Sequence, residues 1–143
     1  MTTVVQVLEL KDAAIYTIAP NATVRKAIEI MADKNIGALV VTDENQKVIG
    51  IVSERDYTHK VELKNRASTS TLVHEIMTHK VITVTRHAKV EECLKIMTNG
   101  HLRHLPVVEN DQLIAMIAIG DLVKAALEDQ QKLIHQLQQY ISG

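Results

Sequence analysis

The stretch Gly50-Ile51-Val52-Ser53-Glu54-Arg55-Asp56 begins apolar, turns polar at a hydroxyl residue and reaches a carboxylate three positions later. A short run rich in Ile and Val that is closed by polar residues is typical of a buried strand that leads into a helix. The stretch recurs further on as Ala115-Met116-Ile117-Ala118-Ile119-Gly120-Asp121. We therefore expect Asp56 and Asp121 at two matching helix starts.

The Asp56 carboxylate has two interpretations. Ser53-x-x-Asp56 has the spacing of a capping box, in which the hydroxyl and the carboxylate satisfy backbone N–H groups of the first helical turn. Alternatively, a carboxylate at the end of a strand can accept hydrogen bonds from the two ribose hydroxyls, while the Ser53 hydroxyl and nearby N–H groups meet a phosphate. Ala118 has no capping side chain, yet Asp121 keeps its place. Asp121 could still be its own N-cap, so the repeat favours a ligand without deciding the question.

The composition limits the classes of function. The chain has 143 residues and is 46% hydrophobic, enough for one compact domain or two small repeats that share a core. Its net charge of -1, with no Trp or Phe and three Tyr, predicts no nucleic-acid partner. Cys93 is the only cysteine and lies on the apolar face of an expected helix, which favours core packing. No leader or membrane-spanning run is evident, so we expect a cytoplasmic protein without a membrane partner.

The chain contains a tandem repeat. Sliding it by 66 residues superposes Thr17 on Thr83, and beyond the hairpin turn an offset of 65 superposes Asp56 on Asp121. In the first copy we expect strands over 15–18, 37–41 and 48–52, a helix from 21 or 23 and another over about 54–63. The expected fold is α+β, with small sheets in two β-α-β-β-α units that pack with pseudo-two-fold symmetry and form two related clefts. The expected boundaries are repeat 1 over 4–63, a linker over 64–71, repeat 2 over 72–130 and a C-terminal helix extension over 131–143.

Two further segments support this organisation. The lead-in to the second repeat places Val73 and Ile76 where the first has Val5 and Leu8. A long C-terminal helix is expected over about 121–140, and it predicts either a homodimer contact or packing on the chain's own domain. Its apolar stripe consists of Leu122, Ala126, Leu133, Leu137 and Tyr140.

These segments carry a resemblance to a known family. The chain resembles a tandem cystathionine-β-synthase (CBS) domain pair, or Bateman module, and is most similar to small stand-alone bacterial pairs and their plant organelle relatives. The match covers nearly the whole chain. It rests on Asn35-Ile36-Gly37-Ala38-Leu39-Val40-Val41, Gly50 to Tyr57, Glu75-Ile76-Met77-Thr78, Arg103-His104-Leu105-Pro106-Val107-Val108 and Ile119-Gly120-Asp121.

The resemblance implies an adenosine ligand: AMP, which we favour, or ADP, ATP, an NAD-type dinucleotide or S-adenosylmethionine. It implies that Asp56 holds the ribose hydroxyls and that Ser53 lies near ribose or phosphate. Backbone of the first repeat would meet the adenine edge, at Thr17, Ile18, Gly37, Ala38 and Leu39.

The second repeat carries part of the same motif. Asp121 and the Ile82-Thr83 edge match the first repeat, and Gly120 would let a ligand approach the backbone. Ala118 stands where the family motif usually has Ser or Thr, and Ala115 stands where it usually has Gly. The site of the second repeat could therefore select a different ligand. Four basic side chains are candidate phosphate contacts or ordinary surface charges: Arg55, Arg66, Arg103 and His104. Pro106, also a candidate site residue, is a packing or edge feature, because it has no N–H for a strand ladder.

Three classes of function follow. The first is a regulatory module without catalysis, in which an adenosine nucleotide binds between the repeats and biases the geometry of a homodimer, or its binding to a regulated protein. The second is a structural dimerisation module whose aspartates only cap helices. The third is a metal enzyme built on His101-x-x-His104, which lacks the helical spacing and acidic third ligand of hydrolytic zinc sites. The sequence favours the first, with no metal and no required cofactor.

Overall fold

The computed structural model describes residues 2–10 and 15–142. The chain forms two compact units, each of which combines segments that are distant in sequence. Unit 1 contains residues 1–14, 83–109 and 115–143, and unit 2 contains residues 15–82 and 110–114. The N-terminal segment therefore groups with the body of the second repeat, whereas residues 72–82 group with the body of the first.

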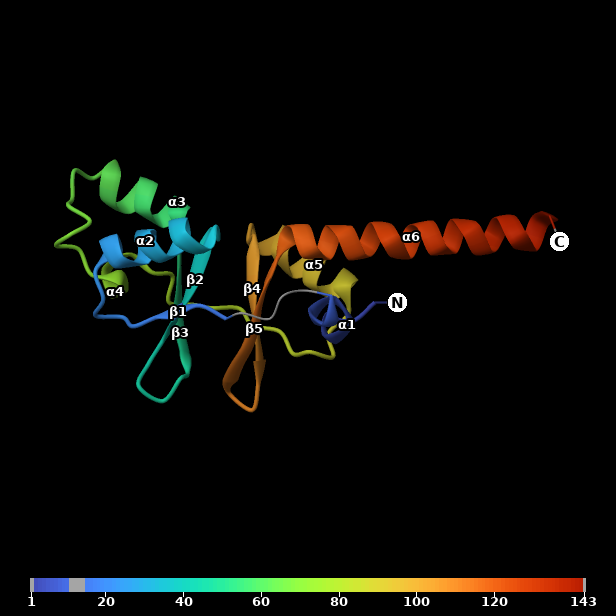
Figure 1. Cartoon of the computed structure of the whole chain (residues 1–143), viewed down its shortest axis with the longest axis horizontal. Helices are drawn as coiled ribbons and strands as arrows, with labels where there is room; N and C mark the ends of the chain where they lie inside the picture. The colour runs from blue at the N-terminus through green and yellow to red at the C-terminus, as the bar shows by residue number, and fades with distance from the viewer. Residues whose placement is uncertain (1, 11–14, 143) are drawn as a thin grey trace. The chain divides into compact units, whose positions relative to one another are not determined.

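Unit 2 is built on a three-stranded sheet of β1 (Thr17–Ile18), β2 (Ala38–Thr42) and β3 (Val48–Ser53), in that order (Figure 1). β1 and β2 are parallel, while β2 and β3 form the expected antiparallel hairpin. Their register places Ala38 opposite Ser53. The end of β3 therefore lies beside the beginning of β2.

The first long helix of unit 2 begins and ends at recognisable capping residues. α2 (Val24–Lys34) begins after Thr23, whose side chain accepts the Lys26 N–H, and ends at Asn35 in the left-handed region with φ 53°. α3 (Glu54–Tyr57) continues directly into the π-helix η1 (Thr58–Glu62). The single helix expected over 54–63 is therefore present, and its hydrogen-bond pattern changes after Tyr57.

Residues 64–71, expected as a linker, fold onto the beginning of α2. The Val24 N–H donates to the Thr71 carbonyl at 2.8 Å, and the Arg25 N–H donates to the Ser68 carbonyl at 3.0 Å. Thr71 is buried and its hydroxyl donates to the Ala67 carbonyl. This segment satisfies two N–H groups that a helix start leaves without intrahelical partners.

The core of unit 2 packs one face of the hairpin, which carries Leu39, Val41 and Val52, against the helices. α4 (Val73–Ile76) contributes to this core although it belongs to the second repeat in sequence. The buried residues are Ile18, Val24, Ala27, Met31, Leu39, Val41, Val52, Val61, Val73, Ile76 and Met77.

Unit 1 repeats this plan with α1 (Val4–Glu9), α5 (Val90–Gly100), a hairpin and α6 (Ile119–Ser142). The hairpin consists of β4 (His104–Glu109) and β5 (Gln112–Ala118), of which residues 110–114 are grouped with unit 2. The Val4 N–H donates to the Ala88 carbonyl as the Val73 N–H donates to that of Ala22. Val73 therefore corresponds to Val4, and the expected match to Val5 is wrong by one residue. An apolar pattern in a single short helix cannot fix its register, because that register is set by these distant backbone bonds.

The first strand expected in the second repeat is reduced to one bridge. Val84 pairs with Val107, as Ile18 pairs with Val41, but Thr83 has no counterpart to the pairing of Thr17 with Val40. Pro106 explains the difference, because it has no N–H with which to continue the ladder past Val84. The Ile82-Thr83 edge is consequently an extended segment outside any strand.

Candidate ligand site

The Asp56 carboxylate forms a capping box with Ser53. Asp56 Oδ2 accepts the Ser53 N–H at 2.9 Å and the Ser53 hydroxyl at 3.1 Å, while Ser53 Oγ accepts the Asp56 N–H at 3.2 Å. The other oxygen, Oδ1, lies 2.9 Å from Lys60 Nζ. The capping interpretation of the sequence is thus realised through Oδ2, while Lys60 engages Oδ1.

A second backbone contact fixes this junction to the beginning of β2. The Glu54 N–H donates to the Gly37 carbonyl at 3.1 Å, and Ala38 is paired with Ser53. The structure therefore brings Gly37 and Ala38 beside Ser53 and the first turn of α3. Gly37 is the residue at which the chain enters β2, so this contact joins the two backbone segments that the resemblance implies for the ligand.

The other candidates of the first repeat are spread along β2. Thr17 is paired with Val40, which lies two residues or about 7 Å along the strand from Ala38. Thr17 and Ile18 line a hollow of about 700 Å³ that extends to the hairpin turn at Gln46, toward the opposite end of β2. Leu39 is fully buried, which leaves only its backbone for a ligand.

The same junction recurs in unit 1. Asp121 Oδ2 accepts the Ala118 N–H at 3.0 Å, and the Ile119 N–H donates to the Arg103 carbonyl at 2.9 Å. These contacts repeat those of Asp56 with Ser53 and of Glu54 with Gly37. α6 begins at Ile119, so the expectation that Asp121 could be its own N-cap is wrong: Asp121 lies inside the first turn and reaches back to Ala118.

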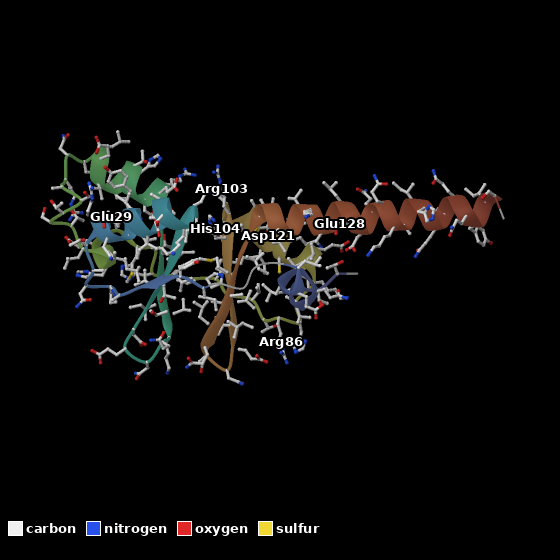
Figure 2. All side chains as sticks on the ribbon, viewed as in Figure 1. Glu29, Arg86, Arg103, His104, Asp121 and Glu128 are labelled. Carbon is white, nitrogen blue, oxygen red and sulfur yellow. The ribbon has the colours of Figure 1, made fainter. Side chains whose placement is uncertain are left out.

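Basic side chains lie close to both junctions in the chain. Arg103 is exposed and His104 is half-buried at the beginning of β4. Figure 2 shows both residues near Asp121, where α6 begins. Arg55 is exposed in the first turn of α3. Lys60 was not predicted from the sequence. Its position four residues after Asp56 in a helix was the available signal.

Arg66 is engaged by an acidic partner. Its Nη2 atom lies 2.7 Å from Glu75 Oε1, and Glu75 Oε2 accepts the Leu72 N–H at 2.7 Å. The Leu72 hydrogen bond, followed by that of Arg66, lowers the pKa of Glu75. A phosphate contact of Arg66 would have to compete with this carboxylate.

Other candidates have environments that reveal their structural roles. A Cβ on Gly50 would overlap Sδ and Cγ of Met77, so the Met77 side chain would have to move to accept any other residue there. A Cβ on Gly120 would meet nothing within 4 Å. Pro106 is buried, whereas Ile82 is 46% exposed.

The structure also describes the histidine motif on which the metal-enzyme hypothesis rests. His101 ends α5 in the left-handed region with φ 54°, the position that Asn35 has after α2. Among residues 2–10 and 15–142, no group of three or more His, Cys, Asp and Glu side chains is arranged to hold a metal ion. Cys93 is buried, and desolvation raises the pKa of its thiol. No helix in the part of the chain that the structure describes is long and apolar enough to cross a bilayer.

The fold and the repeated junction define a tandem pair of α+β repeats with one carboxylate at each strand-to-helix turn. The sequence profile of the CBS domain matches residues 7–62 and 73–128. The chain belongs to the CBS domain family and carries two copies of the domain, which confirms the family and the fold expected from the sequence.

The chain is also similar to individual proteins in sequence and structure. A protein with CBS domains from Burkholderia ambifaria has a solved structure with 48% sequence identity and a TM-score of 0.85, covering 90% of this chain and 96% of that one. A mitochondrial CBS domain-containing protein of Arabidopsis thaliana, CBSX3, is 41% identical over 125 residues, which are 85% of this chain. The match spans 61% of that relative's length. A protein of Acidianus ambivalens is 34% identical over 86% of this chain and 74% of its own.

Proposed function

We propose that the protein is a regulatory CBS pair that binds an adenosine nucleotide, with AMP favoured over ATP and NAD(H). The observation that carries this proposal is the repeated junction, in which Asp56 and Asp121 each accept the backbone N–H of the residue three positions earlier. Ala118 contributes no capping hydroxyl, yet the carboxylate and its geometry are retained. A function in ribose recognition accounts for a carboxylate at both positions.

A solved relative supports the ligand class. The CBS domain pair of protein MJ0100 has been determined in complex with 5′-methylthioadenosine and S-adenosyl-L-methionine, and it matches this chain with a TM-score of 0.80 and 23% identity over 90% of the chain. Both molecules contain adenosine. We propose the same nucleoside as the shared element of ligands for this chain.

The Asp56 side chain can combine capping with ligand binding. A carboxylate offers about four lone-pair positions on its two oxygens. Oδ2 receives both donors of Ser53, so we propose that the ribose hydroxyls bind at Oδ1 in competition with Lys60. The backbone of Gly37 and Ala38, held beside Ser53, would meet the adenine edge.

The charged end of the nucleotide requires basic groups. We propose Arg103 and His104 at the Asp121 junction, and Arg55 at the Asp56 junction, as the phosphate contacts. A guanidinium suits a phosphate because it offers several donors in a fixed geometry. The nucleotide would then act on a cytoplasmic homodimer and its regulated protein partner through its different affinities for their arrangements.

Calorimetric titration of AMP, ATP and NADH tests this function. We expect AMP to bind wild type, and Asp56→Ala or Asp121→Ala to weaken that binding at the junction that is used. Thermal unfolding of each variant in the absence of nucleotide separates loss of the cap from loss of the ligand. The proposal fails if wild type binds none of the three nucleotides at millimolar concentration.

A further inference from the structure

The C-terminal half of α6 has no packing partner in the described chain. Only Leu122 and Ala125 of this 24-residue helix are buried, and every residue over 130–142 is exposed. Figure 1 shows α6 continuing past α5 and α1, the other helices of unit 1. A helical segment of this length is marginal in water without tertiary packing. Packing against a partner would stabilise this segment.

The exposed face has the spacing of a coiled coil. Apolar residues alternate at intervals of three and four, interrupted only by Gln130, and a second row at intervals of seven widens the stripe. The first row is Val123, Ala126, Gln130, Leu133, Leu137 and Tyr140, and the second is Leu127, Ile134 and Ile141. We call these nine residues the α6 stripe.

The α6 stripe is large for a monomer surface. Its exposed fractions reach 86% for Tyr140 and 83% for Ile141, and Leu127, Leu133 and Leu137 are all more than half exposed. Monomeric proteins rarely expose a contiguous apolar patch of more than a few hundred Å². A stable interface buries about 800 Å² on each partner, which a two-row stripe along five helical turns can supply.

We infer that the α6 stripe binds the α6 stripe of a second copy of this chain, with the two helices antiparallel. The small residues of the stripe lie toward its N-terminal end and the large residues toward its C-terminal end. An antiparallel pair therefore packs the small residues of each copy against the large residues of the other. Val123 faces Tyr140 of the second copy, Ala126 faces Leu137 and Gln130 faces Leu133.

The surface beside the small residues has room for the large ones. A groove of about 540 Å³ is lined by Gly120, Val123 and Leu127 along one side of α6. A second hollow, of about 580 Å³, is lined by Ala126, Gln130 and Leu133 on the side that includes Glu91 of α5. Tyr140 and Leu137 of the second copy would enter these hollows.

The charges of α6 favour the antiparallel direction. A parallel pair would place Asp129 beside Ile134 of the other helix and desolvate the carboxylate against an apolar side chain, which is costly. An antiparallel pair places Asp129 beside Gln136 and brings Ile134 beside Leu127. No like charges face each other in this arrangement, since the residues over 133–142 carry no Asp, Glu, Lys or Arg.

This inference gives a contact surface for the homodimer in the proposed function, but it does not depend on nucleotide binding. Analytical ultracentrifugation of the full chain without nucleotide tests it. We expect a dimer for wild type and a monomer for Leu133→Lys/Leu137→Lys. The matched control Gln131→Lys/Gln138→Lys adds the same charges outside the α6 stripe and should remain dimeric. A monomeric wild type, or a dimer that survives the stripe substitutions, would overturn the inference.

Disulfide trapping tests the direction of the helices. Ala126→Cys/Leu137→Cys should form covalent dimers under mild oxidation, because the two positions face each other across an antiparallel pair. Neither single variant should do so, and the buried Cys93 of wild type serves as the background control. Covalent dimers of Leu137→Cys alone would instead establish a parallel pair and contradict the antiparallel arrangement.

Discussion

The Lys60 ammonium lies 2.9 Å from Asp56 Oδ1, one turn further along the same helix. Lys60 also donates to the Ile76 carbonyl at 2.8 Å. The Asp56 side chain is 15% exposed and that of Lys60 is 45% exposed, so solvent screens the pair and its contribution to stability is small. Its importance lies in the oxygen that Lys60 occupies, which is the oxygen we assign to ribose.

Replacing Lys60 should strengthen the binding of a nucleoside without a phosphate. In Lys60→Met, the ribose hydroxyls no longer compete with an ion pair worth roughly 0.2 to 1 kcal/mol, so the adenosine affinity should rise by up to about fivefold. Titration calorimetry with adenosine measures this change, and Lys60→Arg, which keeps the charge, is the control. Weaker adenosine binding in Lys60→Met would show that Lys60 assists the ligand and does not compete with it.

The two junctions should respond in opposite ways to exchange of their capping residues. Ser53→Ala removes a hydroxyl that accepts the Asp56 N–H, and should destabilise the protein by about 1 kcal/mol. Ala118→Ser restores this hydroxyl ahead of Asp121 and should stabilise the start of α6 by about 0.5 to 1 kcal/mol. Urea unfolding of both variants provides the comparison. Equal effects of the same sign would contradict the equivalence of the junctions.

Packing against Met77 should make Gly50 intolerant of a methyl group. Gly50→Ala forces the Met77 side chain to move, and we expect a loss of about 1 to 3 kcal/mol in the free energy of unfolding. In a Met77→Ala background the same substitution should cost clearly less. A cost of Gly50→Ala that does not change with residue 77 would exclude this explanation.

The N-terminal segment should contribute a pH-dependent term to stability. The Thr2 hydroxyl and the Thr2 N–H both donate to the Asp129 carboxylate and lower the pKa of Asp129 in the folded state. Because a lowered folded-state pKa favours the ionised carboxylate, this stability is present at neutral pH and is lost as the pH falls through that pKa. Thr2→Val should therefore be less stable than wild type at pH 7, with the difference disappearing in acid.

Denaturant unfolding of Thr2→Val and wild type across the acidic range measures the stability difference. NMR titration of Asp129 measures its pKa. A stability difference that is independent of pH would assign the effect of Thr2 to packing.

The fold was predictable because the features that define it are local and occur twice. The hairpin, the two helices of each copy and the carboxylates Asp56 and Asp121 follow from periodicity and an offset that a single sequence displays. The loss of the strand at Thr83 was not predicted, although Pro106 in the facing strand has no N–H for the ladder and was the available signal.

Other features depend on distant backbone partners and have no local signal. The correspondence of Val73 with Val4 is set by hydrogen bonds to Ala22 and Ala88, and the role of residues 64–71 is set by the start of α2. The engagement of Arg66 by Glu75 likewise arises because the two residues approach each other only in the folded unit.

The central claim is that a carboxylate at the strand-to-helix junction binds ribose hydroxyls. Titration calorimetry of AMP and 2′-deoxy-AMP into wild type and Asp56→Asn tests it most directly, with Asp121→Asn in parallel. We expect 2′-deoxy-AMP to bind wild type at least about tenfold more weakly, since a hydrogen bond to a charged group contributes about 1.5 to 3 kcal/mol, and the two ligands to bind equally to the variant that lacks the active carboxylate. Equal affinity of both ligands for wild type would contradict the claim.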